Sequence, residues 1–146
     1  MMKKGLRLNY LLVYYALYFI GGFVYVGLEL LWRGYSHYTM FIVGGICFLI
    51  VGSMNEVINK PMSLLLQGCV GSVIITLVEF ITGCIVNLHL GWNVWDYSDM
   101  PLNILGQVCL PFMLLWVAIA ILCVVVNDLL LVFFNIREKM PKYKLI

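Results

Sequence analysis

Charged residues are scarce in this sequence. Only 11% of the 146 residues are charged, while 64% are apolar, and a soluble domain usually carries about 25% charged residues. So few charges cannot cover the surface of a soluble fold, and we therefore expect the excess apolar surface to face lipid. The sequence also lacks a basic stripe interleaved with aromatic residues, so we expect no nucleic-acid partner.

Motifs for metal, redox and nucleotide chemistry are missing as well. None of the five cysteines belongs to a C-x-x-C pair and all lie in apolar runs, so we interpret them as buried structural thiols. His37 and His89 are too far apart in sequence to form a metal motif. There is no G-x-x-x-x-G-K-[S/T] phosphate loop and no nucleophile–base pair. We therefore expect no metal, no cofactor and no enzymatic activity.

Long apolar runs are what the sequence does have. They cover about residues 10–31, 38–54, 62–86 and 104–134. A helix crosses the ~30 Å hydrocarbon core of a membrane with about 20 residues, so the second run is short and the fourth is longer than a crossing needs. The runs lack the period-two alternation of barrel strands, and lipid requires every backbone group to be paired internally. The sequence thus predicts an all-α polytopic membrane protein with four transmembrane helices.

The basic residues set the orientation of these helices. Arg33 is the only basic residue between the first and second runs or between the third and fourth. The other eight of the nine lie before the first run, between the second and third, or after the fourth: Lys3, Lys4, Arg7, Lys60, Arg137, Lys139, Lys142 and Lys144. By the positive-inside rule, we predict a multi-pass protein of the cell membrane with both termini on the cytoplasmic side.

Residues 35–47 resemble residues 97–109. The two segments share a Tyr-Ser pair, an isoleucine, a glycine and a cysteine at one offset. We interpret this as a tandem repeat of two helical hairpins, at about 10–54 and 62–134, within one transmembrane domain over residues 1–134. The alternative is that the similarity does not come from duplication. Trp, Tyr and Ser recur at membrane interfaces, and glycine recurs in membrane helices, because membranes favour them there. Residues 135–146 are predicted to be a basic, poorly ordered cytoplasmic tail.

Two glutamates within the apolar runs mark a candidate binding site. Glu29 and Glu79 lie about nineteen and seventeen residues into runs that both lead outward, so their carboxylates are expected at similar depth in the outer leaflet. Arg33 lies one helical turn after Glu29 and is predicted to pair with it. If Arg33 also met Glu79, one negative charge would remain for a proton or a cationic ligand. The alternative is purely structural pairing.

Polar side chains of the fourth run extend this candidate site. Asn103 and Gln107 are expected on one face at the start of that helix, and Pro111 is expected to kink it about two turns further on. Small residues indicate where helices touch, at Gly45 and Gly52 and at Gly68 and Ser72. Four helices cannot enclose a large cavity alone, so we expect a homo-oligomer or a partner membrane subunit.

The cytoplasmic side carries its own polar groups. Asp128, near the inner end of the fourth run, is expected to pair with Arg137 or Lys60 or to be exposed at the interface. Asn55-Glu56 and Asn59-Lys60 are typical of a solvated turn closed by Pro61. On the outer side, Trp92, Trp95 and Tyr97 are predicted to lie at the lipid–water interface.

Three segments carry a resemblance to a known family. They read Gly27-Leu-Glu-Leu-Leu-Trp-Arg-Gly-Tyr-Ser-His-Tyr-Thr-Met40, Val78-Glu-Phe80 and Trp92-Asn-Val-Trp-Asp-Tyr-Ser98. With them the chain resembles the bacterial membrane proteins labelled "putative ABC-transporter type IV". The resemblance implies a membrane-embedded transporter component with Glu29 and Glu79 as motif carboxylates. Because no phosphate loop is present, an ATP-driven role would require a separate ATPase subunit.

These observations favour a transporter or permease component. Its site would be built from Glu29, Arg33, Glu79, Asn103 and Gln107 and would take a small or cationic substrate in the outer leaflet. The alternative is a structural or regulatory membrane subunit whose buried charges only hold the helices together.

Overall fold

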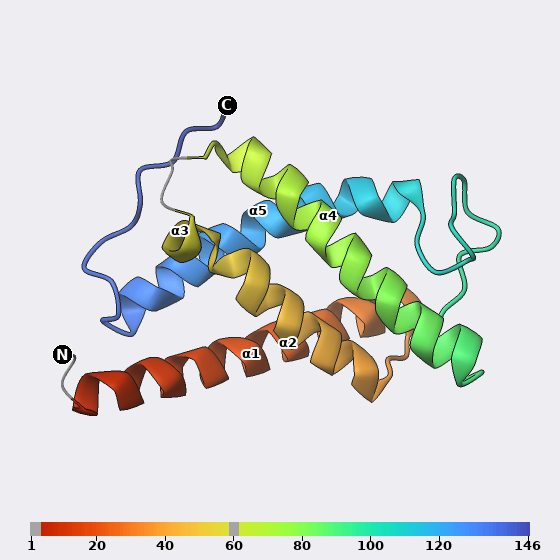
Figure 1. Ribbon diagram of the computed structural model, residues 1–146, viewed down its shortest axis with the longest axis horizontal. Helices are drawn as coiled ribbons and strands as arrows, with labels where there is room; N and C mark the ends of the chain where they lie inside the picture. The colour runs from red at the N-terminus through yellow and green to blue at the C-terminus, as the bar shows by residue number, and fades with distance from the viewer. Residues whose placement is uncertain (1–3, 59–61) are drawn as a thin grey trace. The chain divides into compact units, whose positions relative to one another are not determined.

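The computed structural model describes residues 4–58 and 62–146, with side chains from residue 10 onward. The described chain is helical, and Ile104–Val108 is its one isolated bridge. The elements in order are α1 (Lys4–Arg33), α2 (Tyr38–Gly52), α3 (Met54–Val57), α4 (Leu64–Gly83), the π-helix η1 (Cys84–His89) and α5 (Leu110–Phe133) (Figure 1). The all-α prediction is therefore confirmed.

Three helical segments are long and apolar enough to cross a membrane. They are Tyr10–Arg33, Leu64–His89 and Leu110–Phe133. Helix α2 is also apolar but has 15 residues, and at 1.5 Å per residue it spans about 22 Å. This is short of a ~30 Å hydrocarbon core, so a fourth crossing stays a prediction.

The chain divides into two compact units. Unit 1 comprises Met1–Asn59 and Cys123–Lys142, and unit 2 comprises Lys60–Leu122 and Tyr143–Ile146. The division runs through α5, so that its first half belongs to unit 2 and its second half to unit 1.

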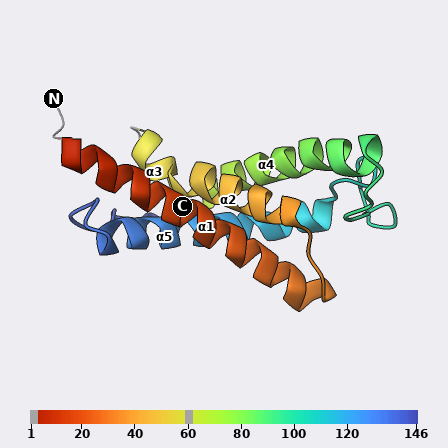
Figure 2. The same cartoon turned by 90° about the horizontal axis from the view of Figure 1, so that it is seen from below.

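Helices α1 and α2 form an antiparallel hairpin in unit 1, and they lie beside each other in both views (Figures 1 and 2). α1 ends at Arg33 and is followed by Gly34, which has a positive φ of 77° and whose N–H donates to the Leu30 carbonyl, as is common after the last helical residue. His37 then caps α2, because its Nδ1 accepts the N–H of Thr39 at 3.4 Å.

Glycines allow α1 and α2 to approach closely. A Cβ on Gly45 would lie 2.5 Å from the ring of Tyr18, and a Cβ on Gly22 would lie 2.7 Å from the ring of Phe41. The adjoining core contains Val13 and Leu17 of α1, Phe48 of α2 and Leu131 of α5. The small face predicted around Gly45 therefore serves packing within the chain.

Unit 2 is built on the contact between α4 and the first half of α5. A Cβ on Gly68 would lie 2.7 Å from Ile121 and 2.9 Å from the carbonyl oxygen of Val117. One turn later, the Ser72 hydroxyl donates to the Met113 carbonyl at 2.5 Å. The Gly68–Ser72 face predicted to touch another helix does so here, against α5.

The last helix begins later than predicted. The apolar run from Ile104 was expected to be helical, but α5 starts at Leu110, and Ile104 to Cys109 form a tight turn. Leu105 and Gly106 both have positive φ, at 52° and 68°, which a helix excludes. Pro111 is thus the second residue of α5, where the missing N–H costs no helical bond, so the predicted kink two turns into the helix is wrong.

The same turn bears on the predicted repeat. Ile42, Gly44 and Cys47 are helical in α2, whereas their counterparts Ile104, Gly106 and Cys109 lie outside any helix. The aligned residues therefore do not share a conformation, and the structure does not show the duplication.

The tail and the cysteines also differ from expectation. The N–H groups of Leu64 and Leu65 at the start of α4 donate to the carbonyls of Lys144 and Leu145, at 2.8 and 3.2 Å. The end of the chain therefore completes the first turn of α4 instead of remaining loose. All five cysteines are free thiols, and Cys69 is exposed while Cys47 and Cys109 are buried.

Candidate polar sites

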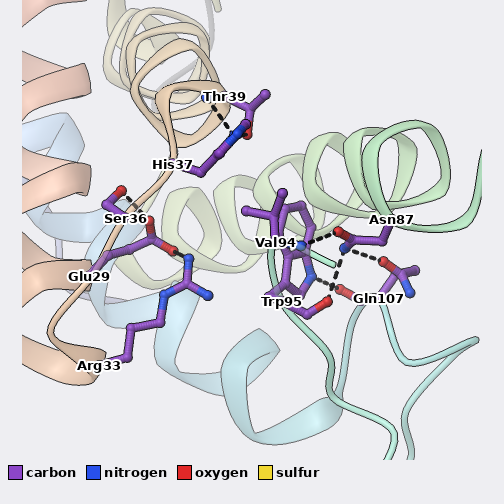
Figure 3. A network of polar contacts seen from close by, with 9 residues as sticks. All are labelled: Glu29, Arg33, Ser36, His37, Thr39, Asn87, Val94, Trp95 and Gln107. Atoms are coloured by element: carbon purple, nitrogen blue, oxygen red, sulfur yellow. Dashed lines mark hydrogen bonds and ion pairs between the residues drawn. The ribbon is translucent and has the colours of Figure 1, made fainter. Parts of the chain in front are cut away.

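Glu29 forms the first site, at the end of α1. Arg33 Nη2 lies 2.5 Å from Glu29 Oε1, and the Ser36 hydroxyl donates to Glu29 Oε2 at 2.5 Å (Figure 3). The Arg33 and Glu29 side chains are only 17% and 14% exposed. The predicted pairing of these two residues is confirmed, and both carboxylate oxygens have a donor.

Local structure explains this arrangement. Glu29 and Arg33 are four residues apart, which places them on one face of α1, and a cation in the last turn also suits the helix dipole. The turn at Gly34 then brings Ser36 back onto Glu29. The Arg33 guanidinium additionally lies over the Tyr35 ring, 4.5 Å from its centroid.

Glu79 forms the second site, between α4 and α5 in unit 2. Its side chain is buried, and its Oε2 accepts the indole N–H of Trp116 at 2.8 Å. A buried carboxylate is costly unless it is bonded, and an indole offers a donor while remaining largely apolar. Sequence analysis missed Trp116. The available signal was a tryptophan in the middle of an apolar run, away from the interface where this residue is enriched.

Aromatic rings continue from Trp116 toward the loop before α5. Phe112 lies one turn before Trp116, with ring centroids 6.2 Å apart, and Tyr97 stacks on Phe112 at 4.7 Å. We call Tyr97, Phe112 and Trp116 the aromatic column. It places three π-faces in series, ending at the residue that bonds Glu79.

Asn87 of η1 holds the loop that precedes α5. Its Oδ1 accepts the Val94 N–H at 2.7 Å, and its Nδ2 donates to the Trp95 carbonyl at 3.0 Å and to Gln107 Oε1 at 2.8 Å (Figure 3). Trp95 Nε1 in turn donates to the Gln107 carbonyl at 2.9 Å. We call Asn87, Val94, Trp95 and Gln107 the Asn87 clamp. A buried network that is fully paired in this way fixes one conformation.

A family model matches residues 13–144, from within α1 to the segment after α5, and its description is "Putative ABC-transporter type IV". The chain belongs to the family that carries this description. The resemblance seen in the three sequence segments is thereby confirmed. No curated protein and no solved structure matches the chain significantly.

Asn103 and Gln107 were predicted to share a helix face, but both lie in the loop before α5. Asn103 Nδ2 donates to the carbonyls of Ser98 and Met100, both at 2.9 Å, and its Oδ1 accepts the Gly106 N–H at 3.1 Å. Gln107 joins the Asn87 clamp and also donates to the Leu105 carbonyl. Both side chains therefore brace the loop.

The predicted site residues divide between the two units. Glu29 and Arg33 belong to unit 1, while Glu79, Asn103 and Gln107 belong to unit 2. The structure brings Glu29 to Arg33 and brings Glu79 to Trp116. The convergence of all three charged residues on one site stays a prediction.

Trp95 is buried in the Asn87 clamp, and its location at the lipid–water interface stays a prediction. Trp92, by contrast, is 45% exposed. The indole N–H of Trp95 is used inside the loop, which removes the reason for it to remain at a wet interface.

The residues around Asp128 also differ from a solvated turn. The predicted pair of Asp128 with Arg137 is confirmed, at 2.5 Å, whereas Asn59, Lys60 and Pro61 lie outside the described residues. Asn55 donates to Asp128 Oδ2 at 2.6 Å, and Glu56 pairs with Arg137. In the described residues, no group of three or more His, Cys, Asp and Glu side chains is arranged to hold a metal ion.

Proposed function

We propose that this chain is the membrane-embedded component of a transporter and crosses the membrane four times. Family membership and the three long apolar helices support a multi-pass membrane protein. Helix α2 returns antiparallel along α1, and the bilayer can thin locally around a helix shorter than its core. The placement of eight basic residues near the two ends of the chain and between α3 and α4 supports a cytoplasmic location for both ends.

We further propose that Glu79 is the residue to which a small organic cation binds. The observation that carries this proposal is a buried carboxylate in an apolar helix pair, bonded to Trp116 at 2.8 Å. A charge within a membrane span is expensive and usually has a function. The aromatic column beside it supplies faces that attract cations. Glu29 and Arg33 are proposed to complete this site, as the sequence predicts.

Transport of a model cation tests this function. Proteoliposomes containing the wild-type chain should take up or release tetraphenylphosphonium faster than empty liposomes, and Glu79→Gln should abolish the difference. Glu138→Gln is the matched control, because Glu138 is an exposed carboxylate after α5. Equal flux in wild type and Glu79→Gln, with both folded, would show that Glu79 does not act on this class of substrate.

The second candidate function is a structural or regulatory subunit. It is favoured by the complete pairing of the Glu29 carboxylate, which accepts from both Arg33 and Ser36. In that case Glu29→Gln and Glu79→Gln would lower thermal stability and leave every transport activity of the assembly unchanged.

Both candidate functions imply that the chain assembles with other subunits. The sequence has no phosphate loop, so we propose that ATP-driven transport by this chain would use a separate ATPase subunit. A second copy of the chain or another membrane subunit would enlarge the transport path. Mild-detergent purification followed by native mass spectrometry distinguishes these assemblies by their stoichiometry.

A further inference from the structure

An apolar groove is lined by α1 and α2 in unit 1, outside the polar sites described above. Its volume is about 360 Å³, within the range of about 300–1,000 Å³ that small-molecule sites occupy. The lining side chains are aliphatic or aromatic: Leu11, Tyr14, Tyr15, Tyr18 and Phe19 of α1, and Leu49 of α2. Such a lining suits a hydrocarbon ligand.

The packing of α1 on α2 holds the floor of this groove in place. Tyr14 and Leu49 both pack against the core of unit 1. The rim is different, because the side chains of Leu11, Tyr15 and Phe19 are 59%, 64% and 50% exposed. The groove is therefore built on a fixed core and is open along its side, where lipid reaches a membrane helix.

The length of the groove matches one leaflet of a bilayer. From Leu11 to Phe19, α1 rises about 12 Å, and one leaflet contributes about 15 Å of hydrocarbon to the membrane core. Leu11 lies in the second turn of the apolar run that begins near residue 10. The groove thus starts where the hydrocarbon of that leaflet starts and follows it inward.

The sequence just before the groove is basic. Lys3, Lys4 and Arg7 precede Leu11, and no acidic residue does. Arg7 is four residues from Leu11, or about 6 Å along a helix. Basic residues beside a membrane span attract anionic lipid headgroups. A lipid whose phosphate lies at the level of this segment would place its acyl chain at the depth of the groove.

We propose that the groove binds an acyl chain of an anionic phospholipid, whose headgroup is attracted by the basic segment before Leu11. Tyr15 and Phe19 contact the chain from the rim, and the floor of the groove contacts it from below, by close packing of apolar atoms. The inference rests on the proposed crossing of the membrane by α1. It does not depend on cation binding at Glu79, which lies in the other unit.

Native mass spectrometry of the purified full chain tests the lipid class without any variant. The chain is titrated in detergent with dioleoyl phosphatidylglycerol or with dioleoyl phosphatidylcholine, which have the same acyl chains and differ in net charge. Wild type should retain one phosphatidylglycerol per chain and prefer it about fivefold or more, the effect expected of one basic residue near the headgroup. Replacing Lys3, Lys4 and Arg7 together by Gln should remove the preference. Equal affinity of wild type for both lipids would overturn the proposal.

A pair of matched variants tests the groove itself. Leu11→Trp should fill the groove and weaken phosphatidylglycerol binding several-fold. Leu12→Trp is the control, because Leu12 is 58% exposed on the same helix but does not line the groove, and it should bind as wild type does. Circular dichroism checks that both variants are folded. Equal lipid affinity in the two variants would overturn the assignment of the groove as the acyl-chain site.

Discussion

Trp116 donates its indole N–H to the buried Glu79 carboxylate over 2.8 Å, and so joins α4 to α5. The bond connects a charged group, which lipid disfavours, to an indole N–H on a mostly apolar helix. The aromatic column extends from this bond.

Removing the indole should weaken this helix contact. Trp116→Phe keeps an aromatic ring but leaves the buried carboxylate without this donor, which should lower the free energy of unfolding by about 1–3 kcal/mol. Denaturant unfolding in micelles measures the loss. A Trp116→Phe, Glu79→Gln double-mutant cycle should show that the two changes are not additive; full additivity would contradict the bond's contribution.

Helix packing predicts a different sensitivity at two glycines. Gly68→Ala would bring a Cβ to 2.9 Å from the Val117 backbone oxygen, and such overpacking should cost about 1–3 kcal/mol. Gly27→Ala is the control, because a Cβ there meets nothing within 4 Å. It should be neutral or slightly stabilising, since alanine favours a helix more than glycine does. Equal effects at both positions would rule out close packing of α4 on α5.

The Asn87 clamp predicts where the loop will open. Asn87→Ala removes the acceptor of the Val94 N–H and the donor to Gln107, so amide hydrogen exchange should increase across residues 94–107. Asn93→Gly is the matched control. It changes a neighbouring exposed asparagine that already has a positive φ of 51°, so exchange there should remain as in wild type.

Asp96 predicts a pH dependence of the same loop. Hydrogen bonds from the Ser98 hydroxyl and N–H lower the pKa of Asp96 below its ordinary value. The folded state thus favours the carboxylate, and the stability that it adds is present above the unfolded pKa and is lost as pH falls through the folded one. An NMR titration should show the Asp96 pKa rising in Ser98→Ala. No change would mean that Ser98 does not hold this carboxylate.

Sequence reasoning succeeded where the interaction is local. Glu29 and Arg33 lie on one helix, so their spacing alone predicts the pair. Apolar composition likewise identifies the long helices, because transfer into lipid depends on composition more than on detail. Asp128 and Arg137 are nine residues apart near one helix end. Few basic residues lie near that end, so Arg137 was one of the few possible partners for the Asp128 carboxylate.

Long-range choices were not predictable in this way. The contact of Glu79 with Trp116 depends on which faces of α4 and α5 meet. The sequence of neither helix indicates which face that is. The run from Ile104 to Cys109 has the composition of a helix. However, Gly106 turns with positive φ beside Asp96 and Ser98, so that a Cβ there would lie 2.5 Å from the Ser98 hydroxyl oxygen. The turn at Gly106 therefore prevents the helix that the apolar composition of this run predicts.

The prediction that Arg33 also serves Glu79 can be tested energetically. If the two residues share one site, Arg33→Gln and Glu79→Gln should have coupled effects on unfolding of roughly 0.5–3 kcal/mol. Glu29→Gln paired with Arg33→Gln is the reference, because that ion pair is observed. If the two substitutions change the free energy of unfolding independently, Arg33 is not part of the cation site at Glu79.

Equilibrium binding of tetraphenylphosphonium to the purified chain tests the central claim most directly. Wild type and Glu138→Gln should bind it saturably, and Glu79→Gln should bind at least tenfold more weakly, because a carboxylate in an apolar site supplies the attraction. Trp116→Phe should keep the folded state and bind with altered affinity. Equal affinity in wild type and Glu79→Gln would contradict the assignment of Glu79 as the residue that receives a cation.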